Sequence, residues 1–542
     1  MRVGSRQVRK RWRQGRSIQT SRLDHKDLER KNEDLQRELQ KLRKQVAERD
    51  ERLAEAERRR SEADSQRAEA ERRRAEAEKQ VAEAEKKISD LERQLALRKQ
   101  NSTTSSKPPS SDGLAGSPRQ RGRRGKSKRK AGGQPGHKGR RRELVAAERV
   151  SKFVDLYPDE CRACGQFLPT SGNSIIESGE PRRHQVVEIP EIQPEITEYR
   201  LHSVICVDPD CEHATSASLP PEIENQMGPR LVAWIAYMTV VCRMPRRVVQ
   251  RFLEEALGIG ISLGSTQKAW EEASSAVEVP CRELQEDLKN QAVLNGDETG
   301  HRTNGEKRWL WVLVAKMYVV FKIATTRKAE VLAVLLGKAF AGILCSDRCP
   351  SYAKYHRGRL QYCWAHFKRN ILGVLELART TEAERFCRDA LALHARLFRL
   401  WHRYRGDTVK SRPRITRQEL ILKVIPLMKK FFALAERHLE GPDRDVRNLA
   451  RALFQNMEHF FTFVEYDGVD PTNNAAERAL RHAVIWRKIM MGCRSEIGEI
   501  AVARLLTVAQ TCKMQKRPAL AYLADAIRRH RLGSTASSLL PH

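Results

Sequence analysis

Residues 28–98 are the part of this sequence that allows the fewest structures, because apolar residues recur there at heptad spacing with no proline or glycine between them. Leu28 and Leu35 begin one apolar row, and a second row follows it by four residues. This pattern predicts a coiled coil over residues 23–99, and Asn32 on the seam favours a two-stranded assembly. The central part is nearly all Ala, Glu and Arg, so a solvated single helix is the alternative to a dimerisation arm.

Positive charge is concentrated at two places in this chain of 542 residues, whose formal net charge is +32. Residues 1–22 form a basic N-terminal tail with eight Lys or Arg and no acid, and residues 119–142 hold twelve and no acid. Such runs usually neutralise nucleic-acid phosphates. A solvated, disordered tail is the alternative, and a membrane-surface patch is less favoured because no apolar anchor accompanies the charge. No apolar segment reaches the roughly 18–20 residues of a membrane span, so we expect a protein inside a cell with no membrane partner.

Residues 100–145 predict a disordered linker. Its first part, residues 101–112, is rich in Ser and Pro, cannot continue a helix and has little to bury. Its basic second part can lie along a DNA backbone and become ordered on contact. The predicted nucleic-acid-binding residues of this linker are Arg121, Arg123, Arg124, Lys126, Lys128, Arg129, Lys130 and Lys138.

Two close cysteine pairs indicate a small zinc-binding domain over residues 146–222. The first pair is Cys161 and Cys164, and the second is Cys206 and Cys211. Twelve cysteines in so long an intracellular chain favour metal binding over a disulfide framework. Four thiolates would hold one tetrahedral, structural Zn²⁺ with no open position for catalysis.

The stretch between the cysteine pairs alternates like strands around residues 185–189 and 195–204, which predicts a β-hairpin framed by the two pairs. The second pair is more widely spaced than the first, so His202 or His213 can replace one of its ligands. Four unlinked cysteines are the remaining alternative.

Residues 223–290 are helical by their apolar period. A turn rich in glycine, residues 258–264, separates two of the expected helices. This arrangement fits a helix-turn-helix that reads DNA, and it fits a plain helical packing unit equally well.

From residue 291 the pattern changes to three antiparallel strands, a helix, a strand, a helix and a strand. The expected strands cover residues 292–295, 309–315, 318–324, 342–345 and 359–364, with helices over 328–340 and from 365. This order predicts a mixed α/β, ribonuclease-H-like catalytic domain over residues 291–490, in which the ends of the first and fourth strands are neighbours. Residues 375–460 are almost wholly helical and are interpreted as an insertion, and residues 491–542 as a C-terminal helical segment.

Three carboxylates occupy distinctive positions in this domain. Asp297 is expected at the end of the first strand and Asp347 directly after the fourth. Glu477 is expected in the first turn of a helix over residues 475–490. Two strand-end aspartates and a helical glutamate can hold two Mg²⁺ (or Mn²⁺) ions for phosphoryl transfer on nucleic acid. A single aspartate is more often a cap or an ion-pair partner, so the prediction rests on the three together.

The helix that carries Glu477 is also expected to contact DNA. Thr472 or Asn473 can cap its N-terminus. Basic residues on this helix can contact the DNA backbone on either side of the scissile phosphate, and they are Arg478, Arg481, Arg487 and Lys488.

Several motifs stand out as a series: residues 101–112 and 132–139, Asp297-Glu-Thr-Gly300 with Trp309-Leu-Trp-Val312, Cys363-Trp-Ala-His366, and Pro471-Thr-Asn-Asn-Ala-Ala-Glu-Arg478. Together these motifs resemble the transposases of the insertion sequence 66 family, which are DDE enzymes. The resemblance implies an N-terminal coiled coil, a Cys-type zinc-binding domain and a ribonuclease-H-like core with a helical insertion before the glutamate. It implies that Asp297, Asp347 and Glu477 are the catalytic triad and that His366 is an auxiliary residue near the site. A helix-start histidine with no role is the alternative for His366. Arg478 is expected as a second auxiliary residue.

The function expected from residues and resemblance together is DNA transposition. The enzyme would cut the ends of its insertion element and join the 3′-hydroxyl to target DNA, as a homo-oligomer in the bacterial cytoplasm, associated with the nucleoid. The resemblance also implies helper proteins of the same element. The alternative is a catalytically inactive, transposase-derived DNA-binding dimer, and a metal-dependent nuclease without strand transfer would use the same residues.

Overall fold

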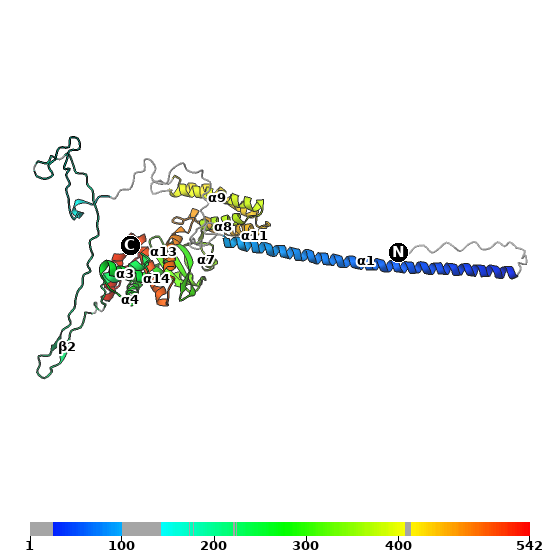
Figure 1. The fold of residues 1–542 in the computed structure, drawn as a ribbon, viewed down its shortest axis with the longest axis horizontal. Coiled ribbons are helices and arrows are strands. Elements are labelled where there is room, and N and C mark those ends of the chain that lie inside the picture. The colour runs from blue at the N-terminus through cyan, green and yellow to red at the C-terminus, as the bar shows by residue number, and fades with distance from the viewer. Residues whose placement is uncertain are drawn as a thin grey trace. The chain divides into compact units, whose positions relative to one another are not determined.

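The computed structural model describes residues 25–99 and 143–541, except residues 173, 177, 221, 222, 224 and 407–413. The chain divides into two compact units, Met1–Lys99 and Gln100–His542 (Figure 1). The predicted basic tail and the predicted DNA-binding residues of the linker lie outside the described residues.

The described part of the first unit is a single helix, α1 (His25–Lys99). Its length agrees with the uninterrupted heptad pattern, because nothing in this stretch breaks a helix. The apolar seam is exposed along the single chain: Leu28, Leu35 and Leu42 are 55%, 62% and 55% exposed. The helix is therefore confirmed, and its pairing with a second copy stays a prediction.

Residues 143–222 contain little regular structure. A short 3₁₀ helix, η2 (Ala147–Arg149), is followed by one two-stranded antiparallel hairpin, β1 (Ser203–Ile205) with β2 (Ala214–Ser216). The hairpin predicted over residues 185–204 is therefore wrong, apart from the last two residues of the predicted range. Pro190 and Pro194 interrupt any ladder there, and the alternating apolar side chains have no packed face to cover them.

A five-stranded mixed sheet lies at the centre of the second unit. Its spatial order is β5-β4-β3-β6-β7, with β3, β4 and β5 antiparallel and with β6 and β7 parallel to β3. These strands are β3 (Val293–Thr303), β4 (Glu306–Val314), β5 (Val319–Ala324), β6 (Ile343–Ser346) and β7 (Leu360–Tyr362). The predicted order of elements is confirmed, and so is the neighbouring position of the first and fourth strands.

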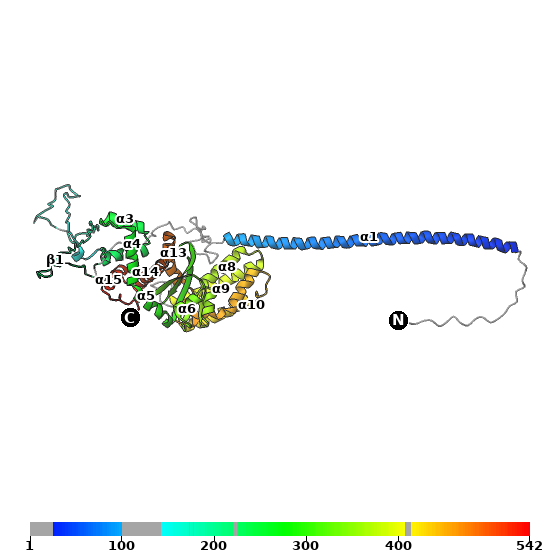
Figure 2. The same cartoon turned by 90° about the horizontal axis from the view of Figure 1, so that it is seen from below.

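Two groups of helices flank the sheet. The first group is α2 (Pro229–Val240), α3 (Arg246–Leu257), α4 (Leu263–Ala276), α5 (Glu278–Asp287) with the 3₁₀ turn η4 (Leu288–Asn290), α14 (Glu496–Met514) and α15 (Ala519–Arg531). The second group is α8 (Trp364–Leu377), α9 (Thr381–Arg405), α10 (Arg417–Glu436), α11 (Arg444–Gln455) and α12 (Met457–Glu465). Three further helices lie close to the strands: α6 (Glu330–Leu336), α7 (Pro350–Tyr355) and α13 (Asn474–Met490). Figure 2 shows the strands between the two groups.

Two element boundaries differ from the prediction for identifiable reasons. Strand β3 continues past Asp297 to Thr303, because Asn304 and Gly305, both with positive φ, close a tight hairpin that pairs the whole strand with β4. Helix α6 ends at Leu336 rather than Phe340, because the next residue, Gly337, has a φ of +78°.

The helices before and after the predicted catalytic segment pack together. Helix α2 contacts α4, α14 and α15, and α4 contacts α14 and α15. Residues 223–290 thus share a core with the C-terminal helical segment, which supports the interpretation as a packing unit. Helix α3 contacts α2 and α4 and buries only Val249 and Leu253, so a DNA-reading role for it stays a prediction.

The predicted insertion is helical as expected, and a buried tryptophan packs against its helices. Trp364 is fully buried at the start of α8, among the rings of Phe367, Phe431 and Phe460. Its indole Nε1 donates to the Phe460 carbonyl at 2.6 Å, and its backbone N–H donates to the Pro471 carbonyl at 3.0 Å. The tryptophan therefore joins the insertion to the segment that leads into α13.

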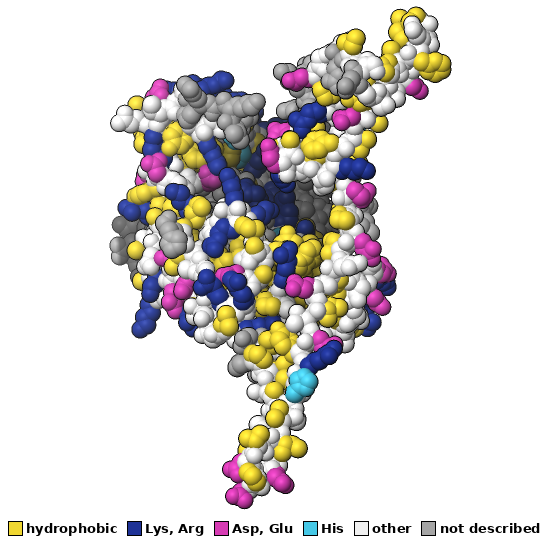
Figure 3. All heavy atoms as spheres, turned by 90° about the vertical axis from the view of Figure 1, so that its left-hand side faces the viewer, with side chains coloured by type: hydrophobic (Ala, Val, Ile, Leu, Met, Phe, Trp, Pro, Cys, Tyr) yellow, Lys and Arg dark blue, Asp and Glu magenta, His cyan; other side chains and the backbone are white. Residues whose placement is uncertain are grey.

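Lys and Arg side chains gather on the compact body of the molecule in Figure 3, in keeping with the basic sequence. Among the described residues, no helix combines the length and the apolar character that crossing a bilayer requires.

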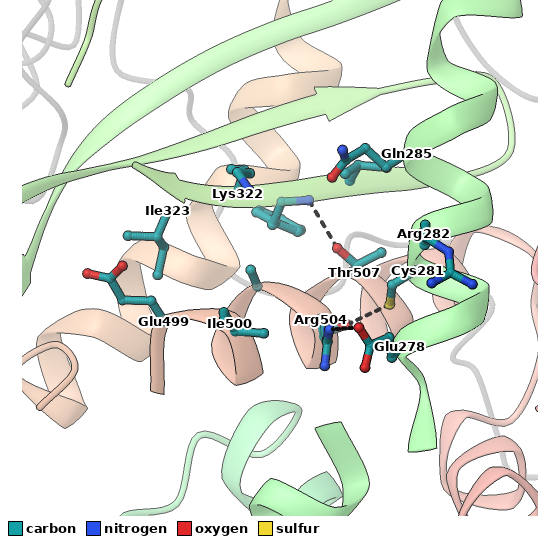
Figure 4. Close-up of a pocket in the computed structure, with 13 residues that line it drawn as sticks. Glu278, Cys281, Arg282, Gln285, Lys322, Ile323, Glu499, Ile500, Arg504 and Thr507 are labelled. Carbon is teal, nitrogen blue, oxygen red and sulfur yellow. Dashed lines mark hydrogen bonds and ion pairs between the residues drawn. The ribbon is translucent and has the colours of Figure 1, made fainter. Parts of the chain in front are cut away.

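The edge strand β5 is covered by two threonines of α14. Thr507 Oγ1 accepts a hydrogen bond from the Phe321 backbone N–H at 3.0 Å, and Thr511 Oγ1 accepts from Val319 at 3.2 Å. Figure 4 shows Thr507 facing the strand beside a cleft of about 320 Å³ between α5, β5 and α14. The residues that line this cleft include none of the three predicted catalytic carboxylates.

Thr507→Val should lower the free energy of unfolding by about 1–3 kcal/mol, because it leaves the Phe321 N–H buried without an acceptor. Thr507→Ser keeps the hydroxyl and is the control. Denaturant unfolding of the three proteins measures the difference. Equal stability of the Val and Ser variants would contradict the role assigned to this hydroxyl.

Candidate active site

Two of the predicted catalytic residues lie on neighbouring parallel strands. Asp297 is in the middle of β3, opposite Val312 of β4, and Asp347 directly follows β6. Because Asn295 pairs with Cys345 in the parallel ladder, both aspartates lie two residues beyond the same register position. The two aspartates therefore lie at the same end of the paired stretch of β3 and β6.

Each aspartate has one oxygen fixed by its own local backbone. Asp297 Oδ1 accepts from the Glu298 N–H at 2.9 Å, and Asp347 Oδ1 accepts from the Cys349 N–H at 2.8 Å. Among the described residues no hydrogen bond reaches the second oxygen of either group. One oxygen of each aspartate is thus oriented while the other stays available as a ligand.

Asn473 positions the third predicted carboxylate. This buried residue is the N-cap of α13, but its side chain caps nothing: its Nδ2 donates to the Gly296 carbonyl at 2.6 Å. Its backbone N–H donates to Cys363 Sγ at 3.2 Å, and its carbonyl accepts from the Glu477 N–H. The first turn of α13, which contains Glu477 as predicted, is thereby tied to the residue that precedes Asp297.

Negative charge accumulates around Asp297. Burial raises the pKa of Asp297 well above its usual value, and the charges of Glu298, Asp347 and Glu477 raise it further. The structure therefore brings all three predicted carboxylates into one electrostatic neighbourhood, although they come from three separate elements. Their catalytic role stays a prediction.

Glu477 has two basic neighbours on α8. Its Oε1 accepts a hydrogen bond from Arg369 at 2.9 Å, and it lies 3.4 Å from His366 Nδ1 without a hydrogen bond. Burial, together with Arg369 and Arg348, lowers the pKa of His366 to about 3, so the imidazole is neutral at neutral pH. The predicted auxiliary His366 thus lies beside the glutamate, and Arg369 is a partner that sequence reasoning missed.

Glu298 is a second residue that sequence reasoning missed. Its side chain is fully buried, its Oε1 accepts from Arg327 Nε at 2.7 Å, and its Oε2 accepts from the Tyr352 hydroxyl at 2.5 Å. Burial and the charge of Asp347 raise its pKa. Tyr352 is on α7, which begins three residues after Asp347, so this contact fixes that helix to β3. The only signal in the sequence is its place next to Asp297.

Two groups of possible metal-ligand atoms occur among the described residues. One is Cys363, His366 and Glu477, and the other is Glu298, Asp347 and Cys349. Within each group the atoms lie within 4.8 Å of one another. Glu477 belongs to the first group and Asp347 to the second, whereas Asp297 belongs to neither.

The predicted DNA-binding residues of α13 differ in exposure. Arg478, Arg481 and Lys488 are exposed. Arg487 is half-buried, and its guanidinium donates to Thr299 Oγ1 at 3.4 Å. The exposed three are suited to contact a nucleic-acid backbone, and Arg487 is suited to a structural contact with β3.

The predicted zinc ligands form two separate turns. Cys161 and Gly165 belong to one tight turn, in which the Gly165 N–H donates to the Cys161 carbonyl at 2.8 Å. Cys206 and Cys211 lie in the connection of the β1–β2 hairpin. In the described part of the chain, these cysteines are in neither of the two groups of possible ligands, so the zinc site stays a prediction.

Asp297→Asn should stabilise the protein in a chelator at pH 8, because it removes a buried charge that its neighbours repel. Each pKa unit of the upward shift corresponds to about 1.4 kcal/mol. The folded state binds this proton more tightly than the unfolded state does, so wild-type stability rises as pH falls, and the stability gained by Asp297→Asn shrinks at lower pH. The difference in unfolding temperature between wild type and Asp297→Asn measures this gain. The control is Asp389→Asn, which removes an exposed carboxylate. An unchanged or lower unfolding temperature at pH 8 would contradict the charge crowding.

Known proteins similar to this chain include two uncharacterized proteins of Sinorhizobium fredii (strain NBRC 101917 / NGR234). The protein y4qI is 28% identical over 258 residues, which are 43% of this chain and 46% of the relative. The protein y4hP is 24% identical over 405 residues, or 69% of this chain and 70% of the relative. This chain thus spans about half the length of the first relative and about two thirds of the second.

A solved structure of the catalytic domain of Mos1 mariner transposase covers 35% of this chain at 14% identity, with a TM-score of 0.10, which is too low to identify a shared fold. Residues 59–143 match a family of unknown function. Residues 224–500, about half of the sequence, match the transposase IS66 family, and they include β3, β6, α13 and all three carboxylates. The chain belongs to the transposase IS66 family.

Proposed function

We propose that this protein is the DDE transposase of an insertion element, which cuts the element ends and joins their 3′-hydroxyl to target DNA by two-metal phosphoryl transfer. The observation that carries this proposal is the charge crowding at Asp297, to which Asp347 and Glu477 contribute from separate elements. Three carboxylates kept together at a cost in stability are typical of a functional site. Membership of the transposase family supplies the reaction class.

The same proposal includes a ribonuclease-H-like core. Its support is the strand order β5-β4-β3-β6-β7, with three antiparallel strands followed by two parallel ones. In this arrangement the first and fourth strands are adjacent, which explains how two aspartates distant in sequence serve one site. The helical insertion between β7 and α13 lets the glutamate approach from a separate helix.

The chemistry of the donor atoms fits Mg²⁺ or Mn²⁺. Asp297 and Asp347 offer free carboxylate oxygens, which hard divalent cations prefer. Asp297, Asp347 and Glu477 would hold two such ions, which when bound activate the attacking oxygen and stabilise the leaving oxygen of an in-line displacement. Positive charge at this place would also relieve the repulsion that raises the pKa of Asp297.

The surrounding residues have positioning roles in this proposal. The Asn473 bond to Gly296 sets the distance between α13 and β3, and the Glu298–Tyr352 bond holds the helix that follows Asp347. Because His366 is neutral, it does not compensate the negative charge of Glu477, which lies beside it. Arg369 compensates it instead and would have to move when a cation binds the glutamate.

DNA is the proposed partner, and the basic residues are the proposed contacts. Arg478, Arg481 and Lys488 are exposed on the helix that carries Glu477, where a phosphate backbone crossing the site would meet them. The basic linker would add contacts that carry no sequence information. We propose further that α1 pairs with a second copy through its exposed seam, and that the protein acts on nucleoid DNA together with helper proteins.

Asp297→Asn, Asp347→Asn and Glu477→Gln should each reduce strand transfer in Mg²⁺ by at least about a thousandfold, because each removes a ligand that stabilises several kcal/mol of transition-state charge. Binding to element-end DNA should persist in a gel-shift assay. The measurement uses end-containing DNA and the full chain.

The matched control is Asp389→Asn, which removes an exposed carboxylate on α9. Equal product from wild type and Asp297→Asn would exclude the proposed site. A wild type that binds the DNA but forms no product would favour the catalytically inactive DNA-binding dimer, and cleavage without joining would favour a nuclease.

The proposed structural zinc has its own test. The full chain, dialysed exhaustively, should retain about one zinc per molecule, held by Cys161, Cys164, Cys206 and Cys211. Cys161→Ser or Cys206→Ser should lower the content towards zero, because a thiolate is lost from a closed site. Cys242→Ser is the control, since Cys242 is an exposed cysteine outside both pairs. Zinc contents near zero in the wild type would contradict the module.

A further inference from the structure

A cluster of mixed donor atoms lies next to the proposed magnesium site. Cys363 precedes α8, His366 lies in its first turn, and Glu477 lies in the first turn of α13. Their sulfur, nitrogen and oxygen atoms are all within 4.8 Å of one another. Hydrogen bonds to residues outside the cluster hold it in place. Cys363 Sγ accepts the Asn473 N–H, and the N–H of Trp364, the residue after Cys363, donates to the Pro471 carbonyl.

His366 Nδ1 in this cluster has no partner of its own. The atom is buried, and neither a protein donor nor an acceptor makes a hydrogen bond with it. Leaving a buried polar atom unpaired costs about 1–3 kcal/mol, so such an atom calls for an explanation. A metal ion between the imidazole, the thiolate and the carboxylate would satisfy it.

We propose that Cys363, His366 and Glu477 bind one transition-metal ion, with Zn²⁺ the best match. A thiolate and an imidazole are the ligands that zinc prefers, whereas Mg²⁺ prefers oxygen alone. Three protein ligands leave the fourth tetrahedral position to water. The ion is thus distinct in kind from the proposed catalytic pair and from the proposed four-cysteine zinc.

One of the two neighbouring guanidinium groups, that of Arg369, limits the affinity of this site. Arg369 already donates to Glu477 at 2.9 Å, and an incoming cation replaces it. The side chain of Arg369 is 20% exposed, so it has a route to solvent. Arg348 is held aside by Asn370 at 2.7 Å and by the ring of Phe367. We therefore expect weaker binding than in a closed four-ligand zinc site.

Glu477 is a ligand both of the proposed catalytic ions and of this ion, so binding at this site affects the proposed reaction. An ion bound to Cys363 and His366 holds Glu477 on the α8 side and withdraws it from the two aspartates. Zinc then inhibits the Mg²⁺-dependent reaction. This consequence rests on the proposed function, whereas the binding itself does not.

Binding can be tested with Co²⁺, which reports thiolate ligands through a near-ultraviolet charge-transfer band. The dialysed full chain is titrated with Co²⁺, and zinc retained elsewhere is silent because it is d¹⁰. Cys363→Ser removes the thiolate while its hydroxyl still accepts the Asn473 N–H. The matched control is Cys345→Ser, at a buried cysteine on the neighbouring strand β6 that belongs to neither donor group.

Wild type and Cys345→Ser should show the band, and Cys363→Ser should lose it with at least about a tenfold drop in Co²⁺ affinity. His366→Gln should weaken binding similarly while the thiolate remains. The same band and affinity in wild type and Cys363→Ser would overturn the site, as would the absence of any band in the wild type.

Inhibition is the second readout. Zinc should suppress Mg²⁺-dependent strand transfer in the wild type and in Cys345→Ser, and Cys363→Ser should need at least about tenfold more zinc. Equal zinc sensitivity of the three proteins would overturn the inhibitory role. A wild type with the cobalt band but no strand transfer under any condition would count against the proposed function and support the metal site, so the two failures are distinguishable.

Discussion

The hydrogen bond from Asn473 to the Gly296 carbonyl is the contact on which the geometry of the site depends. It joins the helix of Glu477 to the strand of Asp297 at 2.6 Å, and both residues that make it are buried. The same residue accepts the Glu477 N–H and donates to Cys363. One buried residue, through its side-chain amide and its backbone, thus connects three segments that are far apart in the sequence.

The packing around this hydrogen bond also requires a glycine at position 296. A β-carbon there would lie 2.8 Å from Cε1 of the Tyr352 ring, so only glycine lets Tyr352 reach Glu298. Helix α7, which follows Asp347, and helix α13, which carries Glu477, therefore both contact one short stretch of β3 around Gly296. Close packing of backbone and ring at this point determines where the carboxylates can lie.

Much of this could be predicted from the sequence, and what could not has physical reasons. The order of strands and helices follows from hydrophobic period, the hairpin at Asn304 from turn chemistry, and the position of Glu477 from its place after a short polar stretch. The continuation of β3 past Asp297 was missed, because local pattern does not show how far a hairpin partner extends a strand.

Residues that act through tertiary contacts were also missed. Arg369 and Glu298 occupy ordinary-looking positions, and their importance arises only when α8, α13 and α7 meet β3. Asn473 was expected as a helix cap, a local role, and instead makes a long-range bond. The hairpin expected near residue 190 was wrong because alternation predicts a strand only where another surface covers it.

The site combines charge repulsion with structural restraint. Asp297 and Glu298 are adjacent acidic residues, both with raised pKa values, and burial is the largest cause for each. Arg327 compensates Glu298, and among the described residues no ion pair compensates Asp297. A protein that keeps one partly buried carboxylate without an ion-pair partner gives up stability there, and a bound cation can recover that stability.

The two threonines over β5 have a consequence for how copies of this protein can associate. An uncovered sheet edge invites a strand from another molecule, which can lead to filaments or aggregates. With the outward amides of Val319 and Phe321 already occupied by α14, that route is blocked at the centre of the edge. A strand from another copy therefore cannot extend the five-stranded sheet at the amides of Val319 and Phe321.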